Sequence, residues 1–211
     1  MSQKDDHITM YSDYVCPFCY LGRRSLEEYQ ETREEELKIE WQPFDLRSHK
    51  RGPDGEIDHS VEDGKDDSYF DKVRENVRNL QDKYDADEML SLDDLPDDVD
   101  SFDAQVASYY VDTEYPDQWR AFDDAIFEAL WIDGRDIGDL DVIAALAEDV
   151  GLDGDEIRTA VTDEERRDQL REQFTAAQQQ GITGVPTFTY DTYAARGAVP
   201  PEQLERLVEG T

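Results

Sequence analysis

The only two cysteines of this chain, Cys16 and Cys19, flank a Pro-Phe pair where a strand-like segment meets a helix-like one. Residues 7–15 alternate in a β-prone pattern, whereas residues 16–36 carry apolar side chains at roughly helical spacing. Residues 37–47 alternate again and predict a second strand. The sequence therefore predicts a β-α-β unit with parallel strands, in which the cysteine pair begins the connecting helix.

A helical block and a second β-containing segment follow. Residues 48–66 are polar and rich in Gly and Asp, and we expect a loop there. Residues 181–199 return to β-branched and aromatic side chains, which predicts two short antiparallel strands with a turn near Asp191 and Thr192. A last helix is expected at 200–210. Between the two β-containing parts the pattern predicts helices at 67–84, 101–115, 116–132, 139–152 and 163–181, with a short one before the last.

A close cysteine pair can bind zinc, exchange disulfides or fill a core. A structural zinc site needs four ligands, but the chain has no third cysteine, and its histidines have no ligand-like spacing. These histidines are His7, His49 and His59. Burial as small apolar residues remains an alternative, although the spacing and the strand-to-helix position favour a redox pair.

A redox pair needs a thiolate near neutral pH, and a helix N-terminus favours one. Pro17 favours the first helical position, which predicts Cys16 at the N-cap. There its sulfur could accept N–H bonds from Phe18 or Cys19, and the helix dipole acts in the same direction. Cys19 lies one turn in and is better shielded. We therefore expect Cys16 to be the attacking thiol and Cys19 the resolving thiol.

The chain is strongly acidic, with a formal charge of −33 and a pI of about 4.1. Its 11 Tyr, 8 Phe and 3 Trp indicate a folded domain under an acidic surface. Such a surface repels nucleic acids and anionic membranes, so neither is an expected partner. Self-repulsion of this size suggests a halophile, because molar salt shortens the Debye length to about 3 Å. The polar first 15 residues and the lack of a long apolar run predict a soluble, cytoplasmic protein.

Four segments resemble a known family. They are SDYVCPFCYLG (12–22), FEALWIDGRDIGD (127–139), AAQQQGITGVPTF (176–188) and RGAVPPEQLERLVE (196–209). With the β-α-β beginning and β-β-α end, they resemble the FrnE-like subgroup of the DsbA family. This resemblance implies an α/β, thioredoxin-like fold that residues 1–47 and 181–211 build together. Residues 48–180 would form an inserted all-helical domain.

The resemblance also implies roles for individual residues. Cys16 and Cys19 would form the reversible disulfide, and Pro186 would be a cis-proline beside them, with an ordinary trans turn proline as the alternative. The Val185 backbone would then face an incoming extended peptide, and Phe18 and Val185 are the expected substrate-binding residues. No metal or organic cofactor is expected beyond a redox partner, and the substrates would be thiols or disulfides of proteins or small molecules.

Two features bear on the alternatives. Relatives of the FrnE type often carry a DAHR stretch where this chain has Gln105 and Val106. The related 2-hydroxychromene-2-carboxylate isomerases and kappa-class glutathione transferases usually carry Ser at the position of Cys16. The main prediction is a thiol–disulfide oxidoreductase. An isomerase or thiol transferase of that related branch and a redox-sensing binding module remain alternatives, and the oligomeric state stays open.

Residues outside the cysteine motif are given structural roles. Asp13 is interpreted as a loop-solvating or capping residue, with a proton relay as the alternative. The large apolar side chains of the expected helix at 116–132 are assigned to the core of the insertion, and the alternative is that some of them line a substrate site. These side chains are Trp119, Phe122, Phe127, Leu130 and Trp131.

Overall fold

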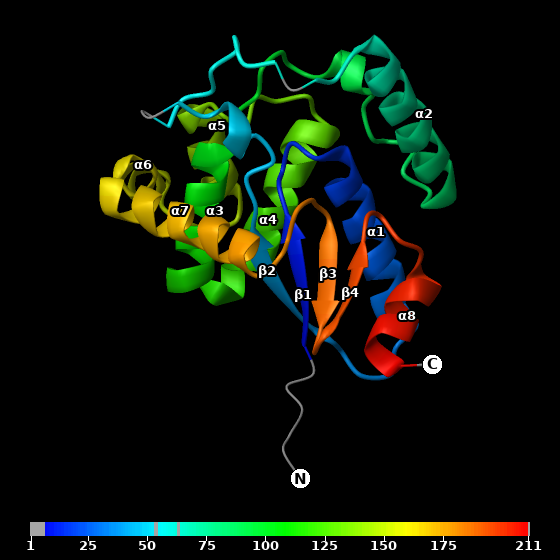
Figure 1. Ribbon diagram of the computed structural model, residues 1–211. Coiled ribbons are helices and arrows are strands. Elements are labelled where there is room, and N and C mark those ends of the chain that lie inside the picture. The colour runs from blue at the N-terminus through cyan, green and yellow to red at the C-terminus, as the bar shows by residue number, and fades with distance from the viewer. Residues whose placement is uncertain (1–6, 53–54, 63, 211) are drawn as a thin grey trace.

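The computed structural model describes residues 7–52, 55–62 and 64–210. Its centre is a four-stranded sheet in the order β2-β1-β3-β4 (Figure 1). The strands are β1 His7–Ser12, β2 Lys38–Pro43, β3 Thr187–Tyr190 and β4 Tyr193–Arg196. β1 pairs with β2 in parallel and with β3 antiparallel, and β3 and β4 form an antiparallel hairpin. The predicted α/β, thioredoxin-like architecture is confirmed.

Helices surround this sheet. They are α1 Pro17–Glu31, α2 Asp67–Lys83, α3 Phe102–Glu114, α4 Pro116–Trp131, α5 Leu140–Asp149, α6 Gly154–Thr162, α7 Glu164–Gln179 and α8 Pro201–Glu209. Two short 3₁₀ turns lie between β2 and α3, η1 at Ser48–Lys50 and η2 at Leu92–Asp94. None of the helices in the described part of the chain combines the length and the apolar character that a membrane crossing requires.

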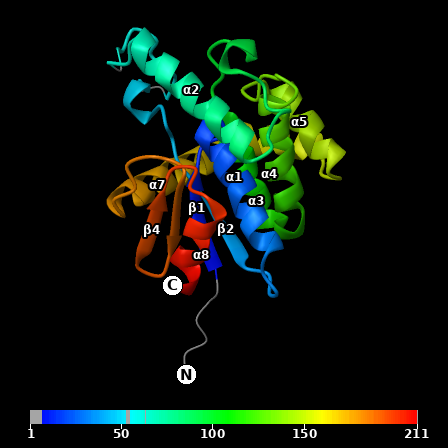
Figure 2. The same cartoon turned by 90° about the vertical axis from the view of Figure 1, so that its right-hand side faces the viewer.

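The two faces of the sheet are covered differently. α1 and α8 cover one face of the sheet (Figure 2). Ile8 and Met10 belong to the main apolar core, which also contains side chains of these two helices. Neighbouring side chains of a strand point to opposite faces, so Tyr11 points to the other face. There it packs with Ala177 of α7 and with Ile182, which follows that helix. The predicted insertion of residues 48–180 includes α7, so part of that segment covers the sheet. The domain boundaries themselves stay a prediction.

The large apolar residues of α4 lie in the main core, as their helical spacing predicts. Trp119, Phe122, Phe127, Leu130 and Trp131 are all less than 9% exposed. Rings from the β-α-β unit join them, because Tyr14 packs edge-on against Phe127 with centroids 4.7 Å apart. The sheet and the inserted helices therefore share one core, which fixes the helices relative to the cysteine motif.

Three predicted elements near the cysteine motif extend too far along the chain: the strands at 7–15 and 37–47, which end at Ser12 and Pro43, and the helix at 16–36, which ends at Glu31. β1 ends at Ser12 because residues 13–16 close a turn, in which the Cys16 N–H donates to the Asp13 carbonyl at 3.1 Å. α1 ends at Glu31 because residues 32–36 are Thr, Arg and three Glu, with no apolar side chain to bury. The turn at residues 13–16 leads into the cysteine motif.

Candidate active site

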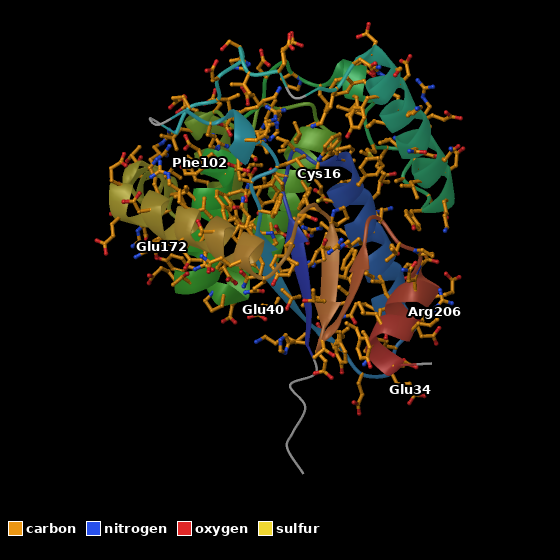
Figure 3. The ribbon with its side chains drawn as sticks, in the orientation of Figure 1. Cys16, Glu34, Glu40, Phe102, Glu172 and Arg206 are labelled. Atoms are coloured by element: carbon orange, nitrogen blue, oxygen red, sulfur yellow. The ribbon has the colours of Figure 1, made fainter. Side chains whose placement is uncertain are left out.

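Cys16 occupies the N-cap of α1, at the end of that helix nearest α2 (Figure 3). Its backbone is extended, with φ −91° and ψ 114°, and Pro17 takes the first helical turn. The Cys16 carbonyl accepts the N–H groups of Cys19 at 3.0 Å and Tyr20 at 3.3 Å. The N-cap placement therefore follows the sequence-based prediction, and the helix dipole points its positive end at this residue.

The contact of the Cys16 sulfur differs from the expected one. No N–H group in the described part of α1 donates to it. The thiol instead donates to the Val185 carbonyl, 3.6 Å away. A protonated thiol needs an acceptor, and the Val185 carbonyl supplies one. The capping bond predicted from Phe18 or Cys19 is therefore absent from this thiol form, in which both cysteines are free and buried.

Cys19 lies directly behind Cys16 and is fully buried. Burial is the main cause that raises the pKa of its thiol well above the ordinary value, and a hydrogen bond with Cys16 and the negative charges of Cys16 and Asp13 add to it. The Asp13 backbone N–H acts in the opposite direction, because it donates toward the Cys19 sulfur. Cys19 is thus held as a thiol, as a resolving residue would be before exchange begins.

Asp13 is a buried hydrogen-bond acceptor, so its interpretation as a loop-solvating residue was wrong. One carboxylate oxygen accepts from the Leu46 N–H at 2.9 Å. The other accepts from the Ser101 hydroxyl, from the Gln105 amide at 3.2 Å and from the Val15 N–H at 3.3 Å. The last bond closes a turn inside the loop before the N-cap, and α1 has no side-chain cap, so the capping role that the sequence suggested is not found either. The others come from the loop that follows β2 and from the start of α3.

The environment of Asp13 shifts its titration into the neutral range. Burial raises the pKa of this carboxyl to about 6, and the nearby Asp45 adds to the rise. The hydrogen bonds from Ser101, Leu46 and Val15 lower the pKa but do not cancel the effect of burial. A carboxyl with such a pKa can give up and accept a proton near neutral pH.

Gln105, which departs from the DAHR pattern, belongs to this same network. Its amide nitrogen donates to Asp13, to the Phe44 carbonyl and to Ser101, each at 3.2 Å. Its amide oxygen is buried and has no hydrogen-bond partner among the described residues. A pattern read along the chain flagged this residue, but only the fold brings it next to the cysteine motif.

Helix α4 holds the loop that precedes Cys16. The Trp131 indole N–H donates to the Tyr14 carbonyl at 2.8 Å, and the Tyr14 hydroxyl donates to Asp123, also at 2.8 Å. Asp123 is buried and forms an ion pair with Arg23 of α1. The inserted helices therefore fix the backbone on the amino side of the cysteine pair.

Pro186 and Gly22 bring β3 against the motif. The Val185–Pro186 bond is cis, and the Pro186 carbonyl accepts the Gly197 N–H at 2.8 Å. A Cβ atom on Gly22 would lie 3.1 Å from Pro186 and 3.2 Å from the Phe188 ring. This close approach explains the glycine of the CPFCYLG segment, a role that sequence reasoning had not assigned.

A cavity of about 500 Å³ opens beside the pair. Cys16, Phe18 and Val185 line it together, so the expected attacking and substrate-binding residues meet at one surface. Leu130 and Trp131 also line it, so part of the α4 core faces this cavity. In the described part of the chain, no three His, Cys, Asp or Glu side chains gather as metal ligands would.

Similar proteins were found by sequence and by structure. The chain is 27% identical to the uncharacterized protein YwbO of Bacillus subtilis (strain 168) over 203 residues, which cover 96% of this chain and 95% of the relative. It is also 27% identical to a 2-hydroxychromene-2-carboxylate isomerase of Sphingobium xenophagum over 87% of this chain and 88% of that one. A probable DsbA oxidoreductase of Streptomyces coelicolor has a similar fold, with a TM-score of 0.74, 21% identity, and coverage of 97% of this chain and 90% of that one.

The match to a protein family covers nearly the whole chain. The family described as DSBA-like thioredoxin domain matches residues 7–209, from the first strand to the last helix. This range contains the cysteine pair at the N-terminus of α1 and the cis-proline beside it. The chain therefore belongs to the DSBA-like thioredoxin domain family of oxidoreductases.

Proposed function

We propose that this DsbA-type oxidoreductase exchanges its Cys16–Cys19 pair with thiols and disulfides, and that Cys16 makes the first attack. The Cys16 thiolate attacks one sulfur of a substrate disulfide and releases the other as a thiolate. Cys19 then attacks the Cys16 sulfur, which frees the second substrate thiol and leaves a Cys16–Cys19 disulfide. Two electrons pass to the substrate, and a redox partner must return them. The reverse sequence oxidises a substrate dithiol.

The observation that carries this proposal is the arrangement of the pair. Cys16 lies at the helix N-terminus on the wall of the cavity, and Cys19 lies behind it with its thiol protonated. A helix N-terminus stabilises a thiolate that faces the substrate. The inner thiol cannot meet a substrate directly and can react only with Cys16, which is the task of a resolving residue.

Asp13 is the group we propose as the acceptor of the Cys19 proton. Cys19 must lose its proton before it attacks, and its raised pKa makes this unfavourable without a base. The Asp13 carboxyl has a pKa of about 6, so it is ionised at pH 7 and close to the ideal for general base catalysis. The charge of Asp13 and its backbone N–H both act on the Cys19 sulfur, which shows that the two residues are neighbours.

The finer assignments are also proposals. The quoted motifs support membership in the FrnE-like subgroup, although Gln105 departs from its pattern. A cytoplasmic location fits a chain whose only cysteines are the active-site pair, because a reducing compartment does not favour structural disulfides. The net charge of −33 supports a protein adapted to high salt.

An isomerase or thiol transferase is the second candidate function. The 27% identity to a 2-hydroxychromene-2-carboxylate isomerase and a cavity that can hold a small molecule both favour it. That relative's name describes chemistry on a small aromatic compound, whereas this chain has the complete cysteine pair. A redox-sensing binding module would use the same disulfide without turnover.

Insulin reduction with two single variants separates these candidates. Cys16→Ser should abolish turnover, while Cys19→Ser should accumulate mixed disulfides that a non-reducing gel detects. Full activity of Cys19→Ser on a small substrate would favour the isomerase or transferase. A wild-type disulfide that changes partner binding without any insulin reduction would favour the sensing module. Mixed disulfides in Cys16→Ser would reverse the proposed roles.

A further inference from the structure

The Gln105 side chain, at the start of α3, is fully buried and has unevenly distributed hydrogen bonds. Its amide nitrogen lies 3.2 Å from each of three acceptors, an Asp13 carboxylate oxygen, the Phe44 carbonyl and the Ser101 hydroxyl. An amide nitrogen carries two hydrogens, so the three acceptors share them. The amide oxygen has no partner, and among the described residues it is the only buried side-chain nitrogen or oxygen in that state.

These contacts fix the direction of the amide group. If the group were turned over, its oxygen would face an ionised carboxylate and a carbonyl, which are both acceptors. The nitrogen therefore stays toward Asp13, and the unpaired oxygen is the cost of that arrangement. A methionine of similar length would avoid the unpaired oxygen but would donate no hydrogen bond. Buried polar atoms without a partner are rare in folded proteins, and functional sites are where such exceptions are expected.

Gln105 acts on Asp13 in two ways. Its amide nitrogen donates directly to the carboxylate and also donates to the Ser101 oxygen. The Ser101 hydroxyl in turn donates to the same carboxylate oxygen. Because Gln105 supplies a donor to the Ser101 oxygen, the hydroxyl hydrogen is left for Asp13, and each bond polarises the next. Both contacts favour the carboxylate over the carboxylic acid, because an amide nitrogen can only donate.

The charge of Asp13 depends on these neutral donors. The titratable and charged groups around it come from α1, from the loop after β2 and from the turn before α3, and they are Cys16, Cys19, Asp45, Arg51 and Asp100. Asp45 opposes the ionisation of Asp13, although it is itself paired with Arg51 at 2.6 Å. Arg51 is shared with Asp100, which it binds at 2.7 Å. The contacts to the Asp13 carboxylate come instead from uncharged N–H and O–H groups.

We propose that Gln105 is a positioning residue for the resolving step, and that its amide, directly and through Ser101, holds Asp13 as the carboxylate that receives the Cys19 proton. The proposal rests on the base role proposed above for Asp13 and names the residue that controls it. In this step the Cys19 proton passes to Asp13 and the Cys19 thiolate attacks the Cys16 sulfur. The Cys16–Cys19 bond forms, the bond from Cys16 to the substrate breaks, and the substrate sulfur leaves as a thiolate. Gln105 acts on this step through Asp13.

Release of a coloured thiolate separates the two steps of exchange. Reduced protein in molar KCl is mixed with the aromatic disulfide dithiobis(nitrobenzoate). One coloured thiolate is released when Cys16 attacks, and a second is released when Cys19 resolves the mixed disulfide. The rate of this second phase in wild type should rise through about pH 6, where Asp13 becomes ionised.

Three variants test the role of the amide. Gln105→Met removes a donor to the carboxylate and should move the midpoint of the second phase up by about one pH unit. Ser101→Ala should move it in the same direction, because the hydroxyl donor is lost. Gln30→Met is the matched control, since it removes an amide hydrogen bond to the Leu37 carbonyl near the other end of α1. This control should leave the midpoint in place.

A measurement on the wild-type protein keeps the proposal testable if a variant does not fold. The side-chain ¹H–¹⁵N signals of Gln105 should change with pH at the midpoint of the second phase, because the amide donates to the group that titrates. Signals that stay constant between about pH 5 and about pH 8 would overturn the proposal.

The outcomes separate this proposal from the proposed function. If Gln105→Met slows the second phase equally at every pH, and leaves the midpoint in place or lowers it, Gln105 has only a structural role and the proposal is wrong. If Asp13→Asn keeps the wild-type second phase, the base role of Asp13 fails, and the role of Gln105 fails with it. If no coloured thiolate is released, the exchange function itself fails.

Discussion

Consider the free energy of unfolding of Asp13→Asn minus that of wild type. This difference should rise as the pH increases from about 5 to about 8. Burial raises the pKa of this carboxyl from 3.8 to about 6. The native state then holds the proton more tightly than the unfolded state does. The stability that this carboxyl contributes is therefore fully present below pH 3.8 and is lost as the pH rises through about 6.

The size of the effect follows from the same shift. A rise from 3.8 to about 6, at about 1.36 kcal/mol per unit of pKa, corresponds to a total loss of about 3 kcal/mol. About half of it, roughly 1.4 kcal/mol, falls between about pH 5 and about pH 8. Asn cannot ionise. In Asp13→Asn an amide NH₂ would also face the Leu46 N–H, which now donates to the Asp13 carboxylate. Two donors would then face each other, and the lost hydrogen bond should lower the free energy of unfolding by about 1–3 kcal/mol at every pH.

Urea unfolding in molar KCl measures this difference. The free energy of unfolding of Asp13→Asn minus that of wild type should rise by roughly 1.4 kcal/mol across this pH range. The constant loss at Leu46 shifts the curve without changing its slope. Asp82→Asn, on the exposed surface of α2, corrects for the removal of one negative charge. A flat or falling difference curve would refute the argument that burial controls the titration of Asp13.

Other predictions concern packing, a buried hydrogen bond and salt. Gly22→Val should lower the free energy of unfolding by about 1–3 kcal/mol, because its side chain meets Pro186 and Phe188. Gly184→Val, whose Cβ has open space, is the matched control in the same urea titration. Tyr14→Phe should cost about 1–2 kcal/mol, because the buried Asp123 loses a donor, whereas Tyr193→Phe at an exposed site should have little effect. Helicity and insulin reduction should rise together as KCl increases, and full values of both in dilute buffer would contradict adaptation to salt.

The local pattern predicted the parts of the fold that depend on neighbouring residues. Alternation marked β1 and β2, and Pro17 marked the first turn of α1. The local pattern did not predict the role of a residue whose hydrogen-bond partners lie far along the chain. Asp13 looked like a surface loop residue because its donors, Leu46, Ser101 and Gln105, lie 33 to 92 positions away.

The local sequence pattern also could not predict which groups surround the cysteine pair. Spacing identified Cys16 and Cys19, but the acceptor of the Cys16 thiol is the Val185 carbonyl, 169 positions later. The part of the cavity lining between Arg47 and Arg74 was missed for a different reason. Its residues are scattered among many acidic ones, and no periodicity marks them. Only folding of that segment over α1 brings them to one surface.

The hydrogen bonds on either side of Cys16 have a consequence for protein engineering. Ser101 and Gln105 of the helical segment satisfy Asp13, and Trp131 fixes the Tyr14 carbonyl. A shortened chain that joined β2 to β3 directly would retain the sheet residues and both cysteines. It would also leave a carboxylate and a carbonyl without these donors. The helices therefore cannot be exchanged as an independent module, and grafting this motif onto a smaller scaffold requires new donors for both groups.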